Sequence, residues 1–350
     1  MPCFEDFNAE NKLRIPLSAY AAQIIDNDCL AFSLKKTTLI NSIILNYYQH
    51  ADCSISLRLR DFRNELKDCL PSKKENEDLV DRLVEGRAKK LSAIYSQKKP
   101  ADVNWQITLN KRVKEFLTQD TYTCEERYYG PRPGRYVRSL IEEYAQLPYH
   151  RREEIVYKEL LDTINAGIKG RYILNLTNLK GSHISIRPYN VETDPLSMYH
   201  YLVGYSVPHT DLADDSEIKY PAQILSIRIS RLINAEIQFL QSGAITELEV
   251  QQIKKELHQK SVQFVSGRSS TIKVRLSDSG IKKYETQLHL RPNTIGKDPI
   301  DDHIYLFECT EAQILYYFFS FGKDAIIIEP QSLAEKFSLD YKEALLQYDK

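Results

Sequence analysis

Two alternating stretches in the middle of the chain constrain its fold most strongly. Met198–Tyr205 has the pattern of a buried strand, because aromatic and β-branched side chains suit a pleated, half-buried surface. Ile224–Leu232 alternates in the same way and is the expected partner strand. On the first strand, the residues expected on one face are Tyr199, Tyr201, Val203 and Tyr205, and those on the other are His200 and Leu202.

A third strand, His183–Tyr189, is predicted beside these two. It carries Arg187, and Ile224–Leu232 carries Arg228 and Arg231. A small sheet cannot bury three unpaired guanidinium groups without a large free-energy cost, so we expect this basic surface to meet solvent or an anion. The candidate ligand-binding residues of the sheet are Arg187, Arg228, Arg231, Tyr201, His183, His200 and Tyr189.

Length and composition set wider bounds. The 350 residues leave room for two or three domains, and the net charge of −1 does not by itself indicate a nucleic-acid partner. The six cysteines have no C-x-x-C spacing, so we expect no metal, cofactor or disulfide framework. No apolar run approaches the roughly 20 residues of a membrane span, and the N-terminus does not resemble a signal peptide. We therefore expect a cytoplasmic protein without a membrane partner.

The first part of the chain contains two similar segments. Arg14–Ser18 alternates like a short strand, and Ser18 is placed to cap a helix over Ala19–Cys29. A second helix is expected to start at Thr37 or Thr38. Its apolar stripe would consist of Leu39, Ile40, Ile43, Ile44 and Tyr47. This strand–helix–helix order resembles the ribbon-helix-helix unit.

The second segment starts at Gln106–Asn110, which repeats the order polar, Ile, any residue, Leu, helix cap. The later positions that correspond are Ile43 with Leu140, Ile44 with Ile141 and Tyr47 with Tyr144. If residues 13–50 and 105–147 are a divergent repeat, their strands pair antiparallel within one chain, because an isolated strand leaves its backbone hydrogen bonds unmade. The alternative is two unrelated helical hairpins. The exposed ribbon face would offer Lys12, Arg14, Pro16, Gln106 and Thr108, which is a weakly basic set for reading DNA.

A long helix with apolar positions from Leu79 to Ile94 is expected between the two segments. The basic residues near its C-terminus are Arg87, Lys89, Lys90, Lys98 and Lys99. Because cations at a helix C-terminus are stabilised by the macrodipole, we interpret them as a solvated helix end rather than a binding site.

The segment Arg127–Arg138 is the strongest local nucleic-acid signal. It combines four arginines and three tyrosines with no carboxylate, and its Gly and Pro residues predict a loop. Arginine on phosphate and aromatic rings on bases suit single-stranded nucleic acid. In the alternative, the tyrosines pack on helices and the arginines pair with Glu125, Glu126, Glu142 and Glu143. The candidate binding residues are Arg127, Tyr128, Tyr129, Arg132, Arg135, Tyr136 and Arg138.

Beyond these segments, the pattern predicts a helix at Arg151–Asn165, a strand at Ile168–Leu176 and a helix at Ile245–Lys260. The last hundred residues alternate strand and helix, with strands at 271–276, 304–308 and 325–329 and helices at 277–284, 311–321 and 331–348. We expect an α+β fold with divisions at 1–147, 148–240 and 241–350.

The middle sheet resembles the WYL domain of bacterial regulators. Tyr201-Leu202 followed by Arg228-x-x-Arg231 matches the family pattern, and Arg187-Pro188-Tyr189 matches the strand before the motif. The sequence departs from the family at His200, which stands for Trp, and at Ser230, which stands for an acidic residue. The resemblance implies a small Sm-like β-barrel or sheet. The run Ala325–Pro330 followed by an amphipathic helix resembles the extension that commonly follows WYL domains, a ferredoxin-like α+β unit.

All these parts together resemble the WYL accessory proteins of type VI-D CRISPR systems. The motifs that carry this resemblance are the ribbon-helix-helix-like start, Tyr136–Tyr144, Met198–Val203 and Arg228–Leu232. The resemblance implies a non-catalytic homodimer that binds single-stranded RNA and enhances an RNA-guided CRISPR effector nuclease.

No catalytic constellation is visible in the sequence. It contains no Walker loop, G-x-S-x-G or H-E-x-x-H motif, and no histidine follows an arginine at the spacing of the RNases common in CRISPR systems. We therefore expect no enzyme. Two binding functions remain: single-stranded RNA binding, or a transcriptional regulator whose ribbon reads operator DNA and whose WYL domain senses a nucleotide or nucleic-acid ligand. The weakly basic ribbon face favours RNA.

Overall fold

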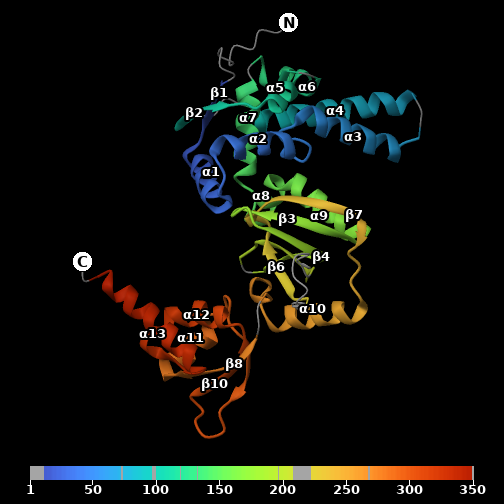
Figure 1. The fold of residues 1–350 in the computed structure, drawn as a ribbon. Coiled ribbons are helices and arrows are strands. Elements are labelled where there is room, and N and C mark those ends of the chain that lie inside the picture. The colour runs from blue at the N-terminus through green and yellow to red at the C-terminus, as the bar shows by residue number, and fades with distance from the viewer. Residues whose placement is uncertain are drawn as a thin grey trace. The chain divides into compact units, whose positions relative to one another are not determined.

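The computed structural model describes residues 12–71, 74–96, 100–118, 120–131, 133–195, 197–207, 222–266 and 269–348. These residues form two compact units, one ending at Lys158 and the other beginning at Glu159 (Figure 1). Helices dominate the first unit, whereas the second contains two antiparallel sheets with helices packed on them. This combination confirms the predicted α+β class. The finer division expected at residues 147/148 and 240/241 stays a prediction.

A two-stranded antiparallel ribbon connects the two similar segments of the first unit. Its strands are β1 (Lys12–Leu17) and β2 (Val103–Thr108), and Arg14 pairs with Gln106. The predicted pairing within one chain is therefore confirmed, although β2 lies slightly before the expected Gln106–Asn110. The reason is that the Asn110 side chain accepts a hydrogen bond from Val113 N (2.8 Å) and so starts the next helix.

The helices of the first unit bury the inner face of this ribbon, where Leu13, Ile15 and Leu17 are fully buried. α1 (Ala19–Phe32) begins where predicted, since the Ser18 hydroxyl accepts a hydrogen bond from Ala21 N. The whole predicted stripe of α2 (Lys36–Tyr47) is buried. The other helices are α3 (Ile55–Cys69), α4 (Lys74–Tyr95), α5 (Lys111–Thr118), α6 (Asp120–Tyr129), α7 (Pro133–Tyr144) and α8 (Tyr149–Val156).

Residues 127–138 do not form the predicted loop. α6 continues to Tyr129, and α7 starts at Pro133 after a short connection in which Gly130 has a φ of 74°. Glycine adopts this left-handed conformation without strain, and proline suits a first helical turn because its missing N–H has no acceptor there. The Gly and Pro residues that predicted a loop thus mark the end of one helix and the start of the next.

The predicted helix Arg151–Asn165 is interrupted at Tyr157, so α8 ends at Val156 and α9 (Lys158–Gly170) begins a new helix. α9 also includes the first residues of the predicted strand Ile168–Leu176. A positive φ at Arg171 (54°) ends the helix, and β3 (Tyr172–Asn178) follows.

The second unit contains a five-stranded antiparallel sheet in the order β6-β5-β4-β3-β7. Its further strands are β4 (His183–Thr193), β5 (His200–Ser206), β6 (Ile224–Arg228) and β7 (Leu232–Ser242). The predicted strand 224–232 is divided, because a 3₁₀ turn at Ile229–Arg231 redirects the chain from β6 into β7. In the described part of the chain β6 and β7 remain separate edges, so the sheet is not the closed barrel that the Sm-like expectation included.

Helices cover both faces of this sheet (Figure 1). On one face, Tyr201, Val203 and Tyr205 pack with Ile253 of α10 (Glu247–Gln259), as the alternation predicted. On the other face, Leu174 lies against Gly167 of α9, where a side chain would collide with it. Glycine at this position therefore leaves room for the Leu174 side chain between helix and strand.

A four-stranded antiparallel sheet in the order β11-β8-β10-β9 forms the C-terminal part. Its elements along the chain are β8 (Ser270–Leu276), α11 (Asp278–Thr286), β9 (Thr294–Lys297), β10 (Ile304–Cys309), α12 (Glu311–Phe318), β11 (Ala325–Glu329) and α13 (Gln331–Leu346). The predicted alternation is confirmed except for the short β9, which was missed. Buried aromatic rings, including Tyr284, Phe307 and Phe318, hold the helices on the sheet.

Candidate nucleic-acid interface

Arg187 of β4 is bound by an acidic partner. Its guanidinium forms a bidentate pair with Glu249 of α10, and Nη1 also donates to the Ala244 carbonyl oxygen (3.2 Å). The hydrogen bonds from Arg187 lower the pKa of the Glu249 carboxyl to about 2. The charge of Arg187 is therefore balanced within the second unit.

Arg228 of β6 lies on an aromatic ring instead. Its Cζ is 3.5 Å from the centroid of the Tyr199 ring, which is a close cation–π contact. Arg231 follows in the 3₁₀ turn and is exposed. We refer to Tyr199, Arg228 and Arg231 as the β6 cluster. A guanidinium stacked on a ring, with a second, exposed guanidinium three residues further along the chain, can contact both a base and a phosphate.

Arg187 and Arg228 do not lie side by side on the sheet. β5 pairs with Arg187 at Tyr205 and with Arg228 at Tyr201. These two positions of β5 are separated by about 13 Å along the strand. Arg187 contacts Glu249 at one end, whereas Arg228 contacts Tyr199 at the other.

The remaining predicted residues of the sheet are distributed over both faces. Tyr201 and Tyr189 belong to the apolar cluster under α10. His200 is buried on the opposite face, whereas His183 is exposed, with its Nδ1 3.2 Å from Thr177 Oγ1. Tyr201 and His200 are therefore buried, Tyr189 is half-buried, and His183 is the most exposed of the four.

Two of the three tyrosines in the Arg/Tyr segment are core residues. The Tyr129 hydroxyl donates to the Cys53 carbonyl oxygen (2.6 Å), and the Tyr136 hydroxyl shares a hydrogen bond with Ser54 Oγ (2.8 Å). Burial raises the pKa of Tyr136 well above its usual value. Because neither ring has an exposed face, stacking of a base on Tyr129 or Tyr136 is excluded in this conformation. The expectation that they bind nucleic acid is corrected accordingly.

The arginines of this segment have unequal roles. Arg138 donates to the Pro100 carbonyl oxygen (2.5 Å), and its Nε lies 3.6 Å from Glu142 Oε1. The contact with Glu142 is one of the arginine–glutamate pairs that the alternative interpretation expected. Arg127 lies over the ring of Tyr128, with 4.6 Å from Cζ to the ring centroid. Arg135 is exposed on α7. Arg132 lies outside the described residues.

The exposed face of the β1–β2 ribbon matches the predicted set. Arg14, Gln106 and Thr108 are exposed, Lys12 and Pro16 are half-buried, and Asn104 adds an exposed amide. This surface has the polar side chains of a DNA reader but little positive charge.

The described residues contain no group of three or more His, Cys, Asp or Glu side chains placed to hold a metal ion. The five cysteines among them are free thiols. Within the same residues, no helix is long and apolar enough to cross a membrane.

Sequence reasoning missed the partners of Arg187 and Arg228. Glu249 is recognisable as part of the Thr246-x-x-Glu249 capping box of α10, but its contact with Arg187 bridges 62 residues. The sequence placed Tyr199 on one face of the sheet but assigned it no binding role. Its contact with Arg228 depends on the register between β5 and β6, which the sequence does not specify.

Comparison with known proteins gives a likeness of fold. No known family model and no curated protein matches the chain. Among solved structures, the chain is similar to a CRISPR Cas-related protein, with a TM-score of 0.72 and 22% sequence identity over 97% of this chain and 94% of that chain. The Proteasome accessory factor B/C (PafBC) of Arthrobacter aurescens matches 71% of this chain and 38% of its own, with a TM-score of 0.28 and 12% identity, which supports no argument. The first likeness shows a shared fold across the length of both chains.

Proposed function

We propose that this chain is a CRISPR-associated accessory protein that binds single-stranded RNA through the β6 cluster and enhances an RNA-guided effector nuclease. The observation that carries the proposal is the Arg228 guanidinium 3.5 Å from the Tyr199 ring, with the exposed Arg231 three residues further along the chain. Stacking and charge at one place suit unpaired bases joined by phosphates. The fold shared with a CRISPR Cas-related protein supports the same assignment.

The proposal includes the finer assignments of each part. The β1–β2 ribbon and its helices support a ribbon-helix-helix-like start, and the five-stranded sheet supports a WYL domain. The element order β-α-β-β-α-β with strand order β11-β8-β10-β9 supports a ferredoxin-like extension. We further propose that the protein is a non-catalytic, cytoplasmic homodimer that works with a type VI-D effector.

Replacing Arg228 and Arg231 together by alanine tests the RNA site. We expect weaker binding of single-stranded RNA and a salt dependence whose slope is smaller by about 0.7 for each phosphate contact that is lost. The measurement is a titration of labelled single-stranded RNA at several salt concentrations, with duplex DNA compared at fixed salt. The enhancement of RNA-guided cleavage should fall in parallel.

Arg187→Gln is the matched control, because the charge of Arg187 is already balanced by Glu249. We expect this variant to keep both the affinity and the salt slope of the unmodified protein. If the double variant is folded and binds RNA with unchanged affinity and slope, the β6 cluster is not the RNA site.

A second candidate function is supported by the ribbon. It presents Arg14, Asn104 and Gln106 on one exposed face, and these residue types read base edges in the major groove. In that case the chain is a transcriptional regulator that binds operator DNA. Arg14→Ala with Gln106→Ala would then weaken sequence-specific duplex binding while leaving single-stranded RNA binding intact.

A further inference from the structure

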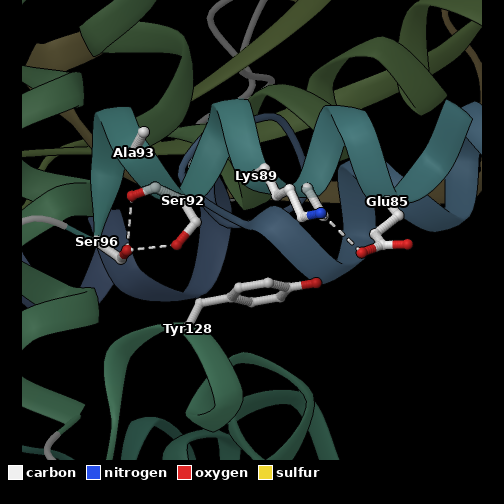
Figure 2. Close-up of a pocket in the computed structure, with 7 residues that line it drawn as sticks. Glu85, Lys89, Ser92, Ala93, Ser96 and Tyr128 are labelled. Carbon is white, nitrogen blue, oxygen red and sulfur yellow. Dashed lines mark hydrogen bonds and ion pairs between the residues drawn. The ribbon is translucent and has the colours of Figure 1, made fainter. Parts of the chain in front are cut away.

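A groove on the first unit lies between α4 and Tyr128 of α6. Its volume is about 550 Å³, and it is lined by Glu85, Ala88, Lys89, Ser92, Ala93, Ser96 and Tyr128. Figure 2 shows the Tyr128 ring across the groove from α4, with its hydroxyl toward the Glu85 end. Sites for small organic ligands have volumes of roughly 300–1,000 Å³, so this groove has room for one nucleotide.

The α4 side of the groove is shaped by small and polar side chains. Ala88, Ser92 and Ser96 follow one another at four-residue spacing and so lie on one helix face. The Ser92 and Ser96 hydroxyl oxygens are 2.7 Å apart, and Ser96 also donates to the Ser92 carbonyl oxygen (Figure 2). These hydroxyls are hydrogen-bonding groups that a ribose or base edge can share.

Tyr128 differs from its two neighbouring tyrosines in exposure. Tyr129 and Tyr136 are core residues, whereas Tyr128 is half-buried and packs on the edge of the core. The Arg127 guanidinium lies over its ring at 4.6 Å. Of the three tyrosines in the Arg/Tyr segment, Tyr128 is therefore the one placed to stack on a base, and it brings a cation with it.

Lys89 supplies a second cation at the groove. Its Nζ is 2.9 Å from Glu85 Oε1, but the two side chains are 76% and 67% exposed. An ion pair so exposed stabilises little, so a phosphate can replace the carboxylate at low free-energy cost. The cations and the ring fit an anionic ligand with a planar group.

We propose that this groove is a second contact site for single-stranded RNA, in which a base stacks on Tyr128 and the adjoining phosphate binds Lys89. The inference rests on the RNA binding proposed above, but it uses residues of the first unit alone. The groove would then be an RNA contact separate from the β6 cluster.

Four single substitutions test the groove by titration of a short, unstructured single-stranded RNA at several salt concentrations. Tyr128→Leu should weaken binding about tenfold with little change in salt slope, because stacking releases no counterions. Lys89→Ala should lower the slope by about 0.7. Glu85→Gln should tighten binding, since it removes the carboxylate that competes with the phosphate. Tyr128→Phe, which keeps the ring, should bind normally.

Lys90→Ala is the matched control, because Lys90 has the same charge but is not among the residues that line the groove. We expect a smaller change than for Lys89→Ala. Thermal melting of every variant separates lost binding from lost folding. Photocrosslinking of the unmodified protein to RNA that contains 5-iodouridine should label the peptide with Tyr128.

The outcomes separate the groove from the β6 cluster. If Tyr128→Leu and Lys89→Ala bind normally and all crosslinks fall in the second unit, the groove is not an RNA site, while the function proposed for the β6 cluster stands. If free mononucleotides bind the groove as tightly as RNA does, the site is a nucleotide site and the RNA contact is wrong. If the unmodified protein binds no single-stranded RNA, both proposals fail.

Discussion

The three tyrosines of the α6–α7 segment show that residue type does not decide role at the scale of single side chains. The Tyr129 hydroxyl binds the backbone of Cys53, and the Tyr136 hydroxyl binds the side chain of Ser54. Tyr128, in contrast, is half-buried at the surface. The same holds for arginine, since Arg187 is paired with Glu249 and Arg231 is exposed. What each side chain can bind is set by the burial and the partner that the fold provides.

Glu125 provides a prediction at this scale. It is buried, and its Oε1 accepts a hydrogen bond from Ser56 N (2.8 Å) at the start of α3. Desolvation by burial, opposed by hydrogen bonds from the α3 N-terminus, raises the pKa of this carboxyl from 4.5 to about 7. The folded state thus binds more protons than the unfolded state between these values, and stability falls as the pH rises through that window.

Glu125→Gln removes this titration while keeping an oxygen acceptor. As the pH rises from 4.5 to 8, the unmodified protein should lose about 3 kcal/mol of unfolding free energy relative to the Glu125→Gln variant. Chemical denaturation at several pH values measures the change. A difference that does not vary with pH would mean that Glu125 titrates alike in both states.

At the scale of elements, buried polar contacts tie helices that are far apart in the chain. Asp28 of α1 is 1% exposed and accepts hydrogen bonds from Arg152 of α8 (2.8 and 3.0 Å) and from the Tyr144 hydroxyl (2.8 Å). Glu142 of α7 similarly binds the Ser18 amide and hydroxyl at the start of α1. Such contacts orient one helix against another in a way that apolar packing alone does not.

Asp28→Ala should destabilise the first unit by about 3–5 kcal/mol, because it leaves the Arg152 charge buried without its partner. Replacing both residues, as Asp28→Leu with Arg152→Met, should cost less than that single change, since no uncompensated charge remains. Asp26→Ala is the matched control on the same helix. Its ion pair with Lys36 is solvent-exposed and should contribute no more than about 1 kcal/mol. Equal losses for Asp28→Ala and Asp26→Ala in denaturant unfolding would contradict this account.

At the scale of the whole molecule, the chain forms two units, and the first contains both strands of its own ribbon. A ribbon made by one chain does not need a second copy to complete its hydrogen bonds. Contacts between the two halves of this unit include the Asn41 side-chain amide, which donates to the Thr108 carbonyl oxygen (3.3 Å). The proposed homodimer is therefore not required for the ribbon to fold.

The isolated first unit tests this independence. A fragment that ends at Lys158 should melt cooperatively, and its Tm should not change over a hundredfold dilution. Where folding depends on association, Tm falls with dilution. Calorimetry or circular dichroism at two concentrations gives the answer. A concentration-dependent Tm would show that the ribbon needs a second chain.

The sequence by itself determined most elements, because their signals are local. Caps such as Ser18, the apolar stripe of α2 and the alternation of β5 depend on neighbours within a few residues. α3 was missed although Ile55, Leu59, Phe62 and Leu66 have helical spacing, and the Gly and Pro between α6 and α7 predicted a loop although they also end and start helices.

Only the tertiary structure decided which candidate side chains can meet a ligand. The Arg187–Glu249 pair, the Arg228–Tyr199 contact and the burial of Tyr129 against Cys53 all join residues whose proximity depends on strand register or helix packing. A local pattern places a residue on a face, but it does not specify what that face packs against. The charge and exposure that make a binding site arise from those long-range contacts, so the sequence supplied the candidates and the fold selected among them.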